Sequence, residues 1–239
     1  MRVLVLQHER MEHPGVFRAF LEEDGHQWRA VQLQERDDPP PIDEFDALWV
    51  MGGVMNAWEE DIYPWLRAEK ALIREAVEGR GMPFLGICLG HQLLAEALGG
   101  TCGPAETAEV GIGDVQLTEG GATGIFFDGV SERFRALQWH GAEVKQMPPG
   151  AKCLATSPAC AVQAMQWGPR AYSLQFHAEA ERDTARNWSA VPAYETELEA
   201  ALGPGGTARL IANCDGEMAA FNQIAERLYI NWLQAAANA

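Results

Sequence analysis

The chain has 239 residues, of which 47% are hydrophobic and 22% are charged. This composition is typical of a globular protein and excludes both an intrinsically disordered chain and a membrane protein. The formal net charge is -16, from 34 acidic and 18 basic residues, and it disfavours nucleic acid and anionic membranes as partners because both repel an acidic surface.

The first half of the chain predicts strands that alternate with helices. Apolar runs predict strands over Arg2–Gln7, Trp28–Leu33, Ala47–Met51 and Pro83–Ile87. One predicted helix starts near Pro14 and stops at Gly25, and a second is indicated by apolar residues at helical spacing over 66–77. Such alternation is typical of a parallel sheet covered by helices on both faces.

The second half predicts shorter strands and then helices. The strands are expected around 109–117, 136–147, 151–156, 161–167 and 171–176, several of them as antiparallel hairpins at the sheet margin. Helix returns from about 181, and the last helix is expected over roughly 207–235, packed against the sheet. We therefore expect one α/β domain over 1–239, flavodoxin-like and doubly wound, with a mostly parallel sheet and a helical C-terminal extension.

Several features of the chain exclude other classes. No signal peptide is indicated at the N-terminus, and the five cysteines form no CxxC pair, which together favour a cytoplasmic protein. No GxxxxGK[ST] sequence supports nucleotide binding. The segment HERMEH (8–13) differs from a metalloprotease helix because its histidines are five residues apart, and it is expected to form a loop.

The stretch PFLGICLGHQLLAEALGG (83–100) predicts a nucleophile on a sharp turn. A strand that ends at Ile87 and a helix that begins near Leu89 leave Cys88 between them, with Gly86 and Gly90 on either side. The start of the helix favours a thiolate and directs free N–H groups toward developing negative charge. A small buried cysteine in tight packing is the structural alternative for this pattern alone.

A candidate base for the thiol follows a later predicted strand. The strand YSLQF delivers His177, and Glu179 comes two residues later. If the extended conformation continues, both side chains lie on one side, where the carboxylate can orient the imidazole. A structural histidine after the strand is the alternative for His177 taken by itself.

These segments together resemble the class I glutamine amidotransferases. The resemblance rests on GICLGHQLLAEALGG, QFHAE and VMGGVMNAWEEDIYPWL, spans roughly 1–180, and is greatest to stand-alone members related to the glutaminase half of guanosine monophosphate synthetase. It implies that Cys88 attacks the glutamine amide while His177 acts as acid and base, oriented by Glu179. It further implies an oxyanion hole made by the N–H groups of Gly53 and Leu89, a substrate contact from Gln92, and no need for a metal or organic cofactor.

The chain departs from the family pattern at three places. Ala178 stands where relatives carry proline, so a backbone restraint on the His–Glu turn is missing. The GGVMN loop lacks a proline that often follows its glycines, and this leaves the oxyanion N–H less firmly placed. Ala142 replaces an acidic residue in QWHGAEV, where His140 is either a pocket residue or a structural histidine.

Three roles follow from these observations. The protein is a stand-alone hydrolase of glutamine or a γ-glutamyl amide or peptide, a glutaminase subunit whose synthetase is a separate chain, or a non-catalytic regulatory protein. The chain has no ATP-binding sequence for a synthetase of its own, and the intact Cys–His–Glu set disfavours the third role. A protein of the PfpI type is disfavoured because such proteins place histidine directly after the cysteine, where this chain has Leu89.

Overall fold

The computed structural model describes residues 1–35, 38–191, 198 and 200–237. Its strands are β1 (Arg2–Gln7), β2 (Gln27–Gln32), β3 (Ala47–Val50), β4 (Phe84–Ile87), β5 (Thr101–Leu117), β6 (Arg133–Gln146), β7 (Lys152–Thr156), β8 (Ala164–Trp167) and β9 (Ala171–Leu174). Its helices are α1 (Phe17–Glu23), α2 (Trp65–Arg74), α3 (Leu89–Ala97), α4 (Glu119–Thr123), α5 (Thr184–Trp188) and α7 (Gly206–Ala237).

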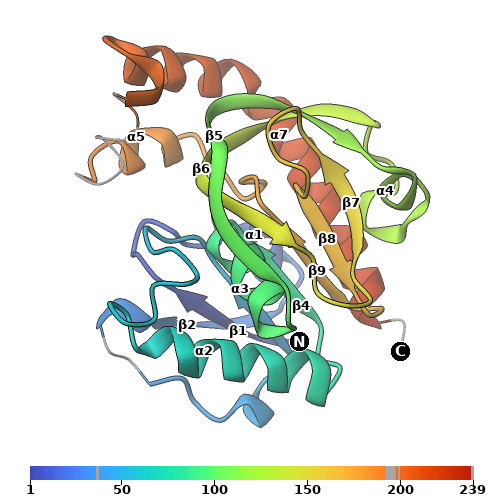
Figure 1. Ribbon diagram of the computed structural model, residues 1–239. Coiled ribbons are helices and arrows are strands. Elements are labelled where there is room, and N and C mark those ends of the chain that lie inside the picture. The colour runs from blue at the N-terminus through green and yellow to red at the C-terminus, as the bar shows by residue number, and fades with distance from the viewer. Residues whose placement is uncertain (36–37, 192–197, 199, 238–239) are drawn as a thin grey trace.

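The described strands form one mixed sheet in the order β2-β1-β3-β4-β9-β8-β7-β5-β6. Neighbours from β2 to β9 pair in parallel, and neighbours from β9 to β6 pair antiparallel. The expected α/β sheet is therefore found, and its predicted strands agree with the structure to within a few residues over the first half of the chain. In Figure 1 the parallel strands lie below and behind the long β5–β6 pair.

The antiparallel part is larger than expected. The predicted piece at 109–117 is the end of β5, which starts at Thr101 and pairs with β6 along most of its length. Sequence missed the first half of β5 because TCGPAETA contains glycine and proline and lacks an apolar alternation. Pairing with β6 overrides that low strand propensity, and a register shift between Pro104 and Glu109 accommodates the irregular segment.

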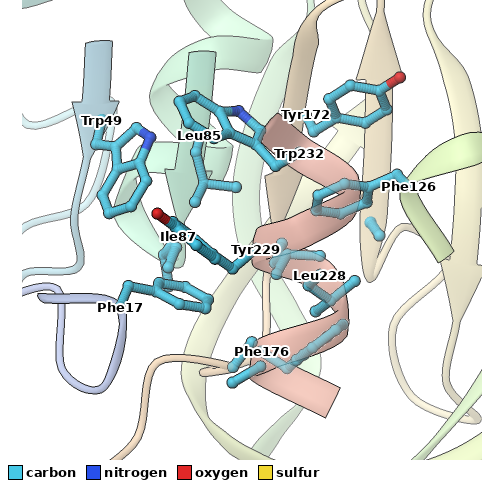
Figure 2. Close-up of a cluster of buried hydrophobic side chains, with 14 of the residues drawn as sticks. Phe17, Trp49, Leu85, Ile87, Phe126, Tyr172, Phe176, Leu228, Tyr229 and Trp232 are labelled. Carbon is cyan, nitrogen blue, oxygen red and sulfur yellow. The ribbon is translucent and has the colours of Figure 1, made fainter. Parts of the chain in front are cut away.

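Helices cover both faces of the sheet. On one face α2 and α3 pack against β1, β3 and β4 through an apolar cluster that includes Leu66, Leu93 and Leu48. On the other face α1 and the second half of α7 pack against the same strands (Figures 1 and 2). None of the helices in the described ranges is both long and apolar enough to cross a membrane.

The last helix confirms the prediction that it packs on the sheet of its own chain. Trp232 stacks edge-on against Trp49 with ring centres 5.2 Å apart, and its indole N–H donates to the Phe84 carbonyl at 3.0 Å. Figure 2 shows Tyr229 and Trp232 of α7 among side chains of the strands. Burying two such aromatic side chains contributes on the order of 2–3 kcal/mol each. Part of the predicted helical extension, 192–197 and 199, lies outside the described residues.

One buried histidine of α3 is held in its neutral form. His91 has no exposed surface; its Nδ1 lies 2.8 Å from the Ser173 hydroxyl and its Nε2 lies 3.1 Å from the Val162 carbonyl. The carbonyl requires a donor at Nε2, and the hydroxyl can donate to Nδ1, so one ring proton satisfies both contacts. Burial lowers the pKa of His91 to about 3.

We predict that His91 makes the protein sensitive to mild acid. Between about pH 6.5 and 3, His91 is protonated in the unfolded chain but stays neutral in the folded chain. The free energy of unfolding therefore falls as pH falls. From pH 7 to pH 5 the wild type should lose about 2 kcal/mol more than His91→Gln in urea titrations. Equal losses in the two proteins would show that His91 is not the buried neutral group.

Candidate active site

Cys88 lies on the turn between β4 and α3, as the sequence predicts. Its backbone has φ 52° and ψ -104°, and it is the one non-glycine residue with positive φ within the described part of the chain. Such a conformation costs about 1–3 kcal/mol and persists only where the surroundings enforce it. The Cys88 N–H donates to the Leu174 carbonyl of β9 at 2.8 Å, which fixes the turn to the neighbouring strand.

The glycines that flank Cys88 are required by close backbone contacts. A Cβ atom on Gly86 would lie 2.5 Å from the Gly90 carbonyl oxygen, and a Cβ atom on Gly90 would lie 2.0 Å from the Val50 carbonyl oxygen. Neither backbone oxygen can move aside as a flexible side chain could. The G-x-C-x-G pattern therefore lets α3 start directly against β3 and β4.

His177 and Glu179 meet as predicted, but through a turn. The imidazole Nδ1 lies 2.8 Å from Glu179 Oε1, and both residues are buried. The strand β9 ends at Leu174, and residues 178–179 form a turn, so strand alternation is the wrong reason for this contact. The His177 N–H donates to the Leu137 carbonyl of β6 at 2.9 Å and holds the histidine at the sheet edge.

The start of the chain holds the Glu179 backbone. The Val16 N–H donates to the Glu179 carbonyl at 2.9 Å. Gly15 has φ 50°, and a Cβ atom there would lie only 1.8 Å from the same carbonyl oxygen. The Pro14-Gly15 turn before α1 thus restrains the His177-Ala178-Glu179 segment, in which the family's proline is absent.

The charges of Cys88 and His177 are coupled. Burial raises the pKa of the Cys88 thiol, and the facing His177 offsets only part of that effect. Burial by itself lowers the pKa of His177, but the negative charges of Glu179 and Cys88 outweigh it and raise the pKa well above its ordinary value. Glu179 therefore favours an imidazolium, the form that can stabilise a thiolate and later donate a proton.

Two glutamines lie in the neighbourhood of Cys88. The Gln175 side-chain nitrogen lies 3.7 Å from Cys88 Sγ, and its side-chain oxygen accepts from Gln92 at 3.2 Å. The Gln92 nitrogen also lies 3.4 Å from the Ala142 carbonyl. Gln92 lines the same hollow as Cys88, its amide already contacts the protein, and its role as a substrate contact stays a prediction.

His140 combines the two roles left open by the sequence. It borders the hollow beside Cys88, and its Nδ1 lies 3.0 Å from the Ala142 carbonyl. Its Nε2 lies 3.3 Å from a carboxylate oxygen of Glu109. Glu109 is further bonded by the Ser157 hydroxyl and the Gln163 amide, both at 2.8 Å, so His140 belongs to a built polar network.

A hollow of about 190 Å³ opens beside Cys88 and is small enough to suit an amino-acid side chain. Gly53 and Leu89, predicted to form the oxyanion hole, both line it. The remaining lining residues are Glu12, Val54, Met55, Asn56, Gln92, Trp139, His140, Gly141 and Ala142.

Two tryptophans, Trp188 and Trp139, pack beside His177. The rings of His177 and Trp188 meet edge to face with centres 4.5 Å apart, and Trp188 meets Trp139 in the same way at 5.4 Å. Trp188 belongs to α5, which packs against the first half of α7 through a cluster that includes Leu210 and Phe221. The C-terminal helices therefore contribute to burial of His177.

Among the residues that the structure describes, two groups of side chains are close enough to hold a metal ion. Glu12, His177 and Glu179 form one group, and Glu109, His140 and Cys160 form the other, each with ligand atoms within 4.8 Å of one another. In both groups a histidine already faces a carboxylate of the same group. The absence of a metal requirement remains a prediction from the sequence.

Comparison with known proteins assigns the family. The glutamine amidotransferase class-I model matches residues 19–187. This chain belongs to the class I glutamine amidotransferases. Membership supports hydrolysis of the glutamine amide as the general activity.

The amidotransferase is similar to both curated and solved relatives. A glutamine amidotransferase-like protein of Salmonella typhimurium, YfeJ, is 35% identical over 184 residues, covering 75% of this chain and 76% of that one. A subunit of the glutamine-hydrolyzing GMP synthase of Thermococcus kodakarensis is 39% identical over 108 residues, covering 45% of this chain and 56% of that one. The crystal structure of a glutamine amidotransferase from Thermotoga maritima superimposes with a TM-score of 0.86 at 28% identity, covering 100% of this chain and 99% of that one. These similarities agree with the predicted family and with a flavodoxin-like α/β fold.

Sequence reasoning missed two residues of the amidotransferase that come from HERMEH. The segment is a loop, as predicted, but Glu12 lines the hollow beside Cys88 and His8 packs under Gly53. The place of HERMEH directly after β1 could have predicted that these residues lie near Cys88, because the carboxyl ends of parallel strands lie at one edge of the sheet.

We predict opposite effects of two glycine substitutions in the amidotransferase. Gly90→Ala should lower the free energy of unfolding by about 2 kcal/mol or more, because its methyl group meets the Val50 carbonyl. Gly216→Ala should raise it by about 0.5–1 kcal/mol, because Gly216 lies within α7 and an added methyl group would meet nothing within 4 Å. Urea unfolding measures the free energy of unfolding of both variants. An unchanged value for Gly90→Ala would contradict the close contact between Gly90 and the Val50 carbonyl.

Proposed function

We propose that this amidotransferase hydrolyses the side-chain amide of glutamine, or a γ-glutamyl amide or peptide, through a thioester on Cys88. The observation that carries the proposal is that Cys88, which lines the hollow, interacts with His177, whose imidazole lies 2.8 Å from Glu179. A nucleophile, a base and a group that orients the base form the minimal set for acyl transfer.

The reaction divides into two halves. The Cys88 thiolate attacks the amide carbon, and the N–H groups of Gly53 and Leu89 stabilise the oxyanion. Imidazolium at His177 gives its proton to the leaving nitrogen, ammonia departs from glutamine, and the thioester remains. Water then gives a proton to His177 and attacks the thioester carbon, which releases glutamate and restores the thiolate.

The placement of Leu89 supports its share of the oxyanion hole. Leu89 is the first residue of α3, so its N–H has no acceptor within the helix. It lines the hollow directly after the nucleophile. The positive end of the helix dipole adds to stabilisation of negative charge there.

A second candidate is a glutaminase subunit that works with a separate synthetase chain. The observation that favours it is the similarity to a GMP synthase subunit. In that case glutamine hydrolysis by the isolated chain is slow, and the partner increases it. The two candidates share the same chemistry at Cys88 and differ in what activates it.

Thiol dependence can be measured directly. Purified protein is given glutamine and a panel of γ-glutamyl amides and peptides, with coupled detection of glutamate and ammonia. We predict release that disappears in Cys88→Ala and persists in Cys153→Ala, a matched cysteine on β7 that is half-buried. Equal release by wild type and Cys88→Ala would overturn the proposal, and release only after addition of a synthetase would select the second candidate.

Removal of the Glu179 charge should slow turnover without removing the nucleophile. We predict that Glu179→Gln lowers kcat by about 10²–10⁴-fold, because His177 loses the group that orients it and favours its charged form. The alkaline limb of the kcat/KM profile should move to lower pH, because the pKa of His177 falls when the carboxylate is removed. An unchanged pH profile would contradict this role for Glu179.

A further inference from the structure

A further histidine–carboxylate pair, separate from those of His177 and His140, lies beneath the loop that follows β3. His8 comes directly after β1, and its Nε2 lies 2.9 Å from Glu69 Oε1 of α2. Its Nδ1 lies 2.8 Å from the Gly52 carbonyl oxygen. His8 has no exposed surface and Glu69 is 2% exposed, so water does not compete for these contacts.

The two partners of His8 define its protonation. A carbonyl oxygen and an ionised carboxylate can only accept hydrogen bonds, so with Glu69 ionised both ring nitrogens donate and the ring is an imidazolium. His91 shows the opposite case, because one of its partners is a hydroxyl that can donate. Burial lowers the pKa of His8, but Glu69, the Gly52 carbonyl and Glu12 together raise it above its ordinary value. Trp65 stacks on the ring at 5.6 Å and adds a cation–π contact.

The contact with Gly52 acts on the next N–H group along the chain. The Gly52 carbonyl and the Gly53 N–H belong to one planar trans peptide, in which they point in opposite directions. Anchoring the carbonyl to His8 therefore fixes the direction of the Gly53 N–H. A charged donor on the carbonyl also polarises the peptide and strengthens the N–H as a donor.

Close packing restricts the movement of the peptide between Gly52 and Gly53. A Cβ atom on Gly53 would lie 2.7 Å from His8 Cβ and 3.0 Å from Leu89 Cδ2, so Gly53 is held between the histidine and the start of α3. Within the ranges that the structure describes, none of the hydrogen bonds has the Gly53 N–H as its donor. With no acceptor among those residues, this N–H can bind a ligand, and Gly53 lines the hollow beside Cys88.

We infer that His8 and Glu69 are a positioning pair that aims the Gly53 N–H at the oxyanion formed on Cys88. The inference rests on the hydrolysis proposed above, because the oxyanion arises only in acyl transfer. The pair supplies the restraint that the GGVMN loop lacks without proline after its glycines. Neither residue transfers a proton to substrate, since both ring nitrogens of His8 are engaged.

The test separates oxyanion stabilisation from reactivity of the thiol. Glu69→Gln keeps an amide oxygen near His8 and removes the negative charge, and His8→Asn shortens the side chain so that it cannot join Gly52 to Glu69. Both should lower kcat about 10–100-fold with KM changed less than about 3-fold, because a misaimed donor loses part of the effect of an oxyanion contact. Alkylation of Cys88 by iodoacetamide should keep its wild-type rate, because that displacement puts no charge on a carbonyl oxygen.

A matched control removes a hydrogen bond to a carboxylate elsewhere. Tyr229→Phe deletes the hydroxyl that lies 2.9 Å from Asp24, on the α1–α7 side of the sheet. It should leave both kcat and alkylation unchanged. Alkylation that slows together with kcat in Glu69→Gln would indicate a general disturbance of the site and overturn the positioning role.

A second measurement does not depend on turnover. In protein labelled with ¹⁵N-histidine, both ring nitrogens of His8 should carry protons at pH 7.5, and Glu69→Gln should remove one of them. A neutral His8 in the wild type would overturn the inference whatever the activity. An active wild type whose Glu69→Gln variant keeps its kcat overturns the positioning role alone, whereas a wild type without Cys88-dependent turnover, with or without a synthetase, overturns the proposed function as well.

Discussion

The candidate active site depends on the parallel pairing of β4 with β9. The nucleophile follows β4 and the base follows β9, so the spacing of two neighbouring strands brings together residues distant in sequence. The bond from the Cys88 N–H to the Leu174 carbonyl continues this pairing into the strained turn. This hydrogen bond helps to offset the unfavourable free energy of the positive φ at Cys88. The spacing of β4 and β9 also sets the distance between the Cys88 thiol and the His177 imidazole.

Local patterns in the sequence predict the turn at Cys88 but not the distant residues that pack against the site. The tight turn at Cys88 follows from GICLG because small residues and a strand-to-helix change lie together in the chain. The contacts of His8 with Glu69 and of Gly15 with Glu179 join separate elements. The hydrophobic periodicity within a single segment cannot predict such a contact. The first half of β5 was missed for a related reason, since its partner strand, and not its own composition, makes it extended.

Three of the buried histidines show how hydrogen-bond partners set the charge of an imidazole. His91 faces a hydroxyl and a carbonyl and stays neutral, whereas His8 faces a carbonyl and a carboxylate and carries a proton on each nitrogen. His177 has a carboxylate on one side and the thiol on the other, so its second proton can be exchanged. Burial disfavours the charged form of each, and the neighbouring groups decide how far this effect is offset.

The contact of Gly15 with Glu179 also has a consequence for how the chain assembles. The turn that carries Glu179 is restrained by the N-terminal segment only when that segment has docked beside the strands formed late in the sequence. A partly synthesised or partly folded chain therefore has the thiol without an oriented imidazole. The local geometry of the residues around 177–179 is therefore a property of the complete tertiary structure and not of the later strands by themselves.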